Sequence, residues 1–193
     1  MNSNPFKQFN EWFNHAQAKS GLPNPNAMCV STIGLDGFPN ARMILLKEFD
    51  EQGFVFYTNF NSTKGQEIIK TPHVALTFHW DTLERQIRIQ GSVSVVSEEE
   101  SDAYFHSRPR RSQLGAWASH QSQPLQNREA LLKRVAQLTQ KYKGKTIPRP
   151  PHWKGFRVVP KMFEFWQGRE NRLHDRIVYT YNATQWKMQR LNP

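Results

Sequence analysis

Three side chains near the C-terminus could bind an anion together. Arg172, His174 and Arg176 follow one another at intervals of two residues, and on an extended backbone such positions share one face. Two permanent cations and one titratable imidazole would repel one another unless a phosphate or an electron-rich ring lay across them. A solvated hairpin face is the alternative interpretation, but Trp166 and the turn expected at Gly168 favour a binding site.

A second group of side chains is typical of a phosphomonoester pocket. Tyr104 and Arg108 are four residues apart, so they would share one face of a helix, and Ser112 follows the break expected at Pro109. A phenol, a guanidinium group and a hydroxyl group that converge can each donate hydrogen bonds to phosphate oxygens.

Two further segments carry cations at the ends of predicted elements. Arg42 and Lys47 are five residues apart, so a regular strand without a bulge would send them to opposite faces, toward different ligands or different parts of one. Two strand-end charges in water are the alternative. Further along, Thr58 ends a predicted strand, and the helix start at Ser62 and Lys64 would attract a phosphate through free backbone N–H groups.

The C-terminal segment also carries a resemblance to a known family. Phe165-Trp166-Gln167-Gly168, followed by the run from Asn171 to Arg176, resembles the signature of the pyridoxamine 5'-phosphate oxidases, FMN enzymes of vitamin B6 salvage. The resemblance extends over about Pro5 to Pro193. It implies oxidation of pyridoxamine or pyridoxine 5'-phosphate to pyridoxal 5'-phosphate, with hydride transfer from C4' to flavin N5. It also implies O2 as acceptor, release of H2O2 and of NH3 from the amine, and a homodimer with FMN at the subunit interface.

The resemblance assigns roles to individual residues. Arg172 and His174 are the implied catalytic pair, and the implied substrate ligands are Lys47, Tyr104, Arg108, Ser112, Arg172, Leu173 and His174. The implied FMN ligands are Arg42, Met43, Ile44, Leu45, Leu46, Lys47, Tyr57, Thr58, Thr63, Lys64, Gln86, Gln121, Ser122, Trp166 and Arg176. Thr63 departs from the family pattern, which usually has arginine there, so one cation near the FMN phosphate is missing or replaced.

The positions of apolar and turn-forming residues predict one mainly β domain with peripheral helices. Aromatic residues at helical spacing predict a helix over 5–20, and Ser97 with Glu100 predicts a capping box that opens a helical insert over about 98–142. Strands are expected at 28–33, 41–49, 54–58, 74–80, 85–96, 155–159, 163–167, 175–181 and 186–190. We therefore expect a closed antiparallel barrel over 1–193, which is consistent with the split β-barrel of the resembled family.

Composition narrows the class of protein. The 193 residues are 37% hydrophobic, and no apolar run approaches the roughly 20 residues that a membrane helix needs. Because the N-terminus has no signal-peptide pattern and Cys29 is alone, we expect a cytoplasmic protein. The histidines have no metal-ligand spacing and no Gly-x-Gly-x-x-Gly is present, so neither a metal site nor a nicotinamide fold is expected.

Two other functions remain as alternatives. A net charge of +10 and a pI near 9.9 would suit a nucleic-acid-binding module. The basic residues, however, are expected to be spread singly over strands and helices rather than gathered on one face, and no nucleic-acid motif is present. A split-barrel flavoprotein of other specificity would keep the flavin residues without Tyr104, Arg108 and Ser112 together. We therefore expect phosphorylated B6 vitamers and O2 as the partners, and neither nucleic acid nor membrane.

Overall fold

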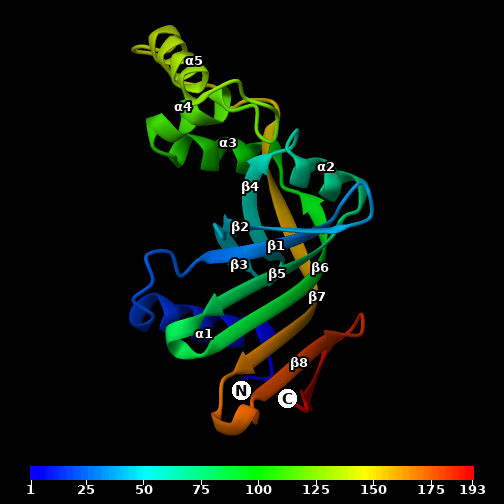
Figure 1. Ribbon diagram of the computed structural model, residues 1–193. Coiled ribbons are helices and arrows are strands. Elements are labelled where there is room, and N and C mark those ends of the chain that lie inside the picture. The colour runs from blue at the N-terminus through cyan, green and yellow to red at the C-terminus, as the bar shows by residue number, and fades with distance from the viewer.

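A nine-stranded antiparallel sheet forms the body of the protein in the computed structural model, which describes all 193 residues (Figure 1). Seven strands follow the order β2-β1-β5-β6-β7-β4-β3, while β8 pairs with β7 and β9 pairs with β8. The strands are β1 Ala27–Ile33, β2 Pro39–Leu45, β3 Glu48–Asp50, β4 Gly53–Asn59, β5 His73–Trp80, β6 Arg85–Val95, β7 Trp153–Gln167, β8 Asp175–Tyr181 and β9 Trp186–Leu191. The mainly antiparallel β class is confirmed. The sheet is a half-barrel, which confirms the split β-barrel that the resembled family implies; β2 and β3 follow one another in the chain, and they pair with β1 and with β4.

Five α-helices surround the sheet unevenly. They are α1 Pro5–Lys19, α2 Thr63–Lys70, α3 Glu98–Ser107, α4 Arg110–Ala118 and α5 Arg128–Lys141. Figure 1 shows α3, α4 and α5 gathered beyond one end of β4, whereas α1 lies near the opposite end of the molecule. The capping box is confirmed, since Ser97 Oγ accepts from the Glu100 N–H and Glu100 Oε2 accepts from the Ser97 N–H. None of the helices has the length and apolar composition needed to cross a membrane.

The N-terminal helix supplies aromatic rings to the core, as its spacing predicts. The Asn4 side chain caps α1 by accepting from the Phe6 N–H at 2.8 Å. Phe9 is fully buried, and its ring centroid lies 4.8 Å from that of Phe54 and 5.2 Å from that of Phe78. Each such aromatic side chain contributes about 1.5 to 3 kcal/mol by leaving water, so its aromatic face holds α1 against the sheet.

Two predicted strands have different limits in the structure. The strand expected at 41–49 is divided into β2 and β3, because Leu46 turns into the core and donates its N–H to the Asn26 carbonyl. The strands expected at 155–159 and 163–167 are one continuous strand, β7. Pro160 is tolerated inside β7 because it lies opposite Gly91, where the register with β6 shifts.

The helical insert differs from prediction in burial and in charge. No residue of α5 is buried, although the spacing of Leu131, Leu132, Val135 and Leu138 predicts a buried face. Leu132 is 54% exposed, because α5 packs on α4 and not on the sheet. The basic residues are not scattered. Residues 106–152 contain ten of the 26 lysines and arginines and one acidic residue, Glu129. The excess of positive charge therefore lies on 106–152, from the end of α3 to the start of β7, whereas the first turn of α3 is acidic.

Candidate active site

A cavity of about 780 Å³ opens beside β2, β4 and the helical insert. Residues from α2 and from the connection after α4 complete its wall. Twelve residues that the sequence singles out line it together: Arg42, Met43, Ile44, Leu45, Lys47, Tyr57, Thr58, Lys64, Tyr104, Arg108, Ser112 and Gln121. Side chains separated by up to 79 positions in the sequence thus meet around one space.

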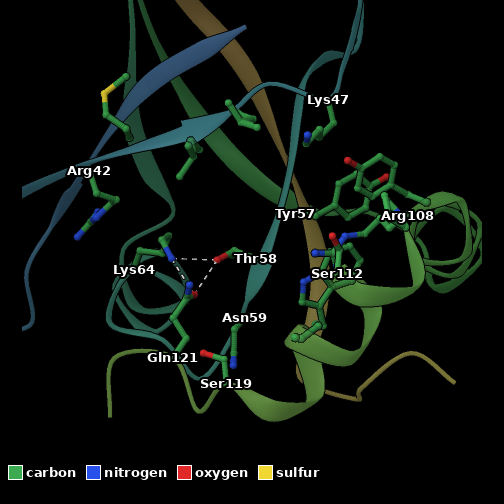
Figure 2. A pocket seen from close by; sticks show the side chains of 18 residues that line it. Arg42, Lys47, Tyr57, Thr58, Asn59, Lys64, Arg108, Ser112, Ser119 and Gln121 are labelled. Carbon is green, nitrogen blue, oxygen red and sulfur yellow. Dashed lines mark hydrogen bonds between the residues drawn. The ribbon is translucent and has the colours of Figure 1, made fainter. Parts of the chain in front are cut away.

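One side of the cavity is built around a buried lysine. Lys64 lies in the first turn of α2, and its Nζ donates to Thr58 Oγ1 at 3.0 Å and to Gln121 Oε1 at 2.9 Å (Figure 2). Burial lowers the pKa of Lys64, the nearby Arg42 lowers it further, and Glu67 opposes both. The hydrogen-bond partners of the ammonium group are neutral oxygens. A bound anion would therefore stabilise the protonated form of Lys64, which burial disfavours.

The opposite side of the cavity has a stacked aromatic wall. The ring centroid of Tyr57 lies 4.1 Å from that of Tyr104 and 5.3 Å from that of Trp153. The Arg108 guanidinium group lies 4.6 Å from the centroid of Trp153, and Lys47 Nζ lies 5.9 Å from that of Tyr104. Figure 2 shows Arg108, Ser112 and Lys47 on the side away from Arg42 and Lys64. The cavity therefore has two separate cationic regions.

Arg108 has a buried nitrogen without a protein partner. Its Nη1 has no hydrogen-bond acceptor, and burial lowers the pKa of its guanidinium group. A buried N–H without an acceptor costs free energy, so the site favours an anionic oxygen at this atom.

Arg108 lies just beyond the end of α3, so the prediction that Tyr104 and Arg108 share one face of a helix is wrong. Arg108 ends α3 in an extended conformation, with φ −73° and ψ 149°, because Pro109 disfavours the helical conformation for the residue before it. Tyr104, Arg108 and Ser112 still line the same cavity, since α4 begins directly after the break.

A second cluster of predicted residues lies at the far end of β7. Gln86 pairs with Trp166 and Trp166 pairs with Arg176, so these three form a row on one face of β6, β7 and β8. The His174 ring centroid lies 4.7 Å from that of Trp166, and Arg176 Nε donates to buried Glu164 at 2.9 Å. The cluster is therefore a coherent group in its own right.

This second cluster does not reach the cavity of the same chain. Trp153 lines the cavity at the start of β7, and Trp166 lies thirteen residues further on, roughly 40 Å along an extended strand. Figure 1 shows the β7–β8 connection at the opposite end of the molecule from α3 and α4. The residues predicted for one site thus form two groups within one chain.

The backbone at Arg172 differs from prediction. Residues Glu170–Arg172 form a 3-10 turn, and Asn171 and Arg172 have φ of 54° and 62°. β8 begins only at Asp175, because the chain must reverse between β7 and β8. Arg172, His174 and Arg176 therefore do not share the face of one strand. Leu173, between them, is 70% exposed.

Six predicted flavin ligands lie outside the cavity wall, namely Gln86, Trp166 and Arg176 of the second cluster and three others, and six wall residues were not predicted. Leu46 is buried in the core, Thr63 is exposed at the start of α2, and Ser122 is exposed with φ of 67°. The unpredicted wall residues are Asn59, Pro109, Gly115, Ala116, Ser119 and Trp153. Trp153 follows the proline-rich segment 148–151 by two residues, and prolines disfavour helix, so a strand start there could have been expected.

Comparison with known proteins decides the family. The pyridoxamine 5'-phosphate oxidase family model matches residues 15–142, and the model of the pyridoxine 5'-phosphate oxidase C-terminal dimerisation region matches residues 153–193. This chain belongs to the pyridoxamine 5'-phosphate oxidase family. It is accordingly an oxidoreductase and a flavoprotein of vitamin B6 metabolism. All the cavity residues except Trp153 lie in the first matched region, and Trp153 and the cluster from Trp166 to Arg176 lie in the second.

Individual relatives agree with this assignment. A pyridoxine/pyridoxamine 5'-phosphate oxidase of Gloeothece citriformis is 56% identical over 193 residues, which is 100% of this chain and 90% of the relative. One of Acaryochloris marina is 54% identical, over 100% of this chain and 88% of the relative. PhzG from Burkholderia lata, solved in complex with tetrahydrophenazine-1-carboxylic acid, has a TM-score of 0.93 and 32% identity, covering 100% of this chain and 94% of PhzG. The fold of this chain is therefore shared with PhzG over its whole length.

Proposed function

We propose that this protein oxidises pyridoxamine 5'-phosphate and pyridoxine 5'-phosphate to pyridoxal 5'-phosphate, with O2 as acceptor. H2O2 is released in both reactions, and NH3 is released from the amine. The observation that carries the proposal is the single cavity with two separate cationic regions. Two phosphate-bearing molecules, a cofactor and a substrate, fit such a cavity better than one does.

The residues of the first region fit the phosphate of FMN. Arg42, Lys64 and Thr58 offer charged and neutral donors, and Lys64 is buried among neutral oxygens. Met43, Ile44 and Leu45 offer apolar contacts along β2 for the rest of the cofactor. When bound, FMN supplies an acceptor for the two electrons and the hydrogen that leave the substrate.

The residues of the second region fit the phosphate of a B6 vitamer. Arg108 offers its unpartnered Nη1, and Tyr104, Ser112 and Lys47 offer further donors on the same side. By holding the phosphate, these residues would fix the distance of the reacting carbon from the cofactor, and orientation of this kind lowers the barrier. Arg172 and His174 would hold the C4' end of the substrate.

The site requires a second subunit under this proposal. We propose a homodimer in which the β7–β8 end of one subunit brings Gln86, Trp166, Arg172, His174 and Arg176 to the cavity of the other. The match of residues 153–193 to a dimerisation region supports this arrangement. Exposed apolar side chains at both places, Met43 at 65% and Leu173 at 70%, are consistent with contact between copies.

A substrate comparison tests the proposal. Purified protein is supplied with FMN, and O2 consumption is measured with pyridoxine 5'-phosphate, with pyridoxamine 5'-phosphate and with unphosphorylated pyridoxine. The proposal predicts a flavin absorbance band and a strong preference for the phosphorylated compounds. Equal rates with pyridoxine would contradict the second phosphate site.

The rival functions have their own outcomes in the same experiment. Turnover of a tricyclic carboxylic acid of the kind bound by PhzG, without turnover of the B6 phosphates, would favour a split-barrel flavoprotein of other specificity. Protein that binds no flavin at any concentration and retains nucleic acid would favour a binding module.

A further inference from the structure

A buried carboxylate contacts Arg42, the arginine of the cationic region that also contains Lys64. Glu67, in the middle of α2, has a side chain that is only 1% exposed and does not line the cavity. Its carboxylate accepts hydrogen bonds from three side chains. Thr32 Oγ1 donates at 2.6 Å, Arg42 Nη2 donates at 3.0 Å, and Asn40 Nδ2 donates as well.

This environment keeps Glu67 ionised. Burial alone would raise the pKa of its carboxyl group, but hydrogen bonds from Thr32, Asn40 and Arg42 outweigh burial and lower the pKa. A buried carboxylate with three donors has a fixed orientation, because any rotation would leave a charged oxygen unpaired. Glu67 can therefore serve as a rigid anchor for what it contacts.

The anchor restricts Arg42 at two atoms. Nη2 donates to Glu67, and Nη1 donates to Thr32, whose hydroxyl group in turn donates to Glu67. The guanidinium group has five N–H donors in a planar fork, so three remain for a ligand. Since Arg42 also lines the cavity, fixing one edge of the fork fixes where the other donors lie.

We propose that Glu67 is a positioning residue that orients Arg42 toward the phosphate of FMN. The inference rests on the proposed function. The direction of the change in FMN affinity distinguishes this role from a direct electrostatic effect of Glu67. A negative charge near a phosphate by itself disfavours binding, so Glu67 can favour binding only through Arg42. Removal of the charge should weaken FMN binding if orientation dominates and should strengthen it if the direct field dominates. The absence of arginine at position 63 makes the orientation of Arg42 more important.

Paired flavin titrations test the inference. Apo-protein is titrated with FMN and, separately, with riboflavin, which lacks the phosphate, and binding is followed by flavin fluorescence. Glu67→Gln should weaken FMN binding roughly tenfold, because part of a charged hydrogen-bond set is lost, and should leave riboflavin binding unchanged. Thr32→Val, which removes the bridging hydroxyl but keeps the carboxylate, should act in the same direction.

A control removes an ion pair that is more exposed and lies away from the cavity. Asp50 accepts from Arg157 Nη1 at 3.2 Å, and neither residue lines the cavity, so Asp50→Asn should leave both flavin affinities unchanged. If Glu67→Gln does not fold, Thr32→Val alone provides the comparison.

Several outcomes would overturn the inference. An equal loss for FMN and riboflavin would give Glu67 a structural role, and unchanged or tighter FMN binding would show that it does not orient Arg42. If the wild-type protein itself does not distinguish FMN from riboflavin, the phosphate region of the proposed function fails and the inference falls with it.

Discussion

Arg108 holds its charge in a half-buried position without a carboxylate partner. Its guanidinium group lies against Trp153, and its Nη1 has no acceptor. This N–H has lost its hydrogen bond to water without gaining one in the protein. A ligand with an anionic oxygen would supply the missing acceptor, and binding would be favoured by the hydrogen bond that forms. Under the proposed function that ligand is the substrate phosphate.

Replacing Arg108 should affect substrate binding and leave the cofactor alone. Arg108→Ala should cost about 1.5 to 3 kcal/mol of binding, the range for a charged hydrogen bond, which corresponds to a KM roughly 10 to 150 times higher. Steady-state kinetics and the flavin content of the purified variant check both parts. Arg108→Lys keeps the charge but not the planar fork of donors, so its KM should lie between those of the wild type and of Arg108→Ala. An unchanged KM for the phosphorylated substrate would remove Arg108 from the site.

Lys64 should give FMN binding a characteristic dependence on pH. Because burial and Arg42 lower its pKa from the ordinary 10.5, Lys64 loses its proton at lower pH than an exposed lysine does. The affinity that depends on this charge is present below the lowered pKa and is lost as pH rises through it, so the decline begins below 10.5. FMN titrations from pH 7.5 upward measure it, with riboflavin as control. Lys64→Met should bind FMN more weakly and without this decline. The same decline in Lys64→Met would assign it to another group.

Elements that depend on local chemistry could be predicted from the sequence. The aromatic spacing of α1, the Ser97 capping box and the limits of β8 agree with the structure, because each depends on residues close together in the chain. The failures fall where a distant group sets the backbone. Lys47 follows β2 because Leu46 bonds to Asn26, and Arg172 lies in a turn that the reversal between β7 and β8 requires.

At the start of α2, Thr63 stands where the resemblance described above implies an arginine. Thr63 is the first residue of the helix, next to the buried Lys64, and its side chain is exposed. A longer cationic side chain at this position could reach a phosphate held by Lys64 and Arg42. Position 63 therefore offers a test of where the phosphate lies.

Thr63→Arg should tighten FMN binding by about one to two decades, the equivalent of one added charged hydrogen bond. The same change should lower stability slightly, by about 0.3 to 1 kcal/mol, because a cation near a helix N-terminus opposes the helix dipole. FMN titration and thermal unfolding of the apo-protein measure the two effects separately, and Thr63→Gln controls for side-chain length. No gain in affinity would mean that position 63 does not face the phosphate.

At the scale of the whole molecule, the types of residue in the site were predictable and their grouping within one chain was not. The sequence names both the cavity residues and the cluster at Trp166 and Arg176. Spacing along a chain cannot show that the sheet order puts them at opposite ends of β7. The concentration of charge on 106–152 was missed for a different reason: single cations look scattered until the acidic residues of the same range are counted, and there is only one, Glu129.

Subunit mixing tests whether two chains complete each site. Arg108→Ala alters the cavity group, and Arg172→Ala alters the β7–β8 group, so each homodimer carries two damaged sites. A heterodimer of the two has one site with both changes and one site with neither. When equal amounts are unfolded together and refolded, half of the dimers should be mixed, and activity should recover to about a quarter of wild type. Each variant refolded alone is the control. If both groups served the same subunit's site, every site in the mixture would still carry one change, and activity would stay at the average of the two variants.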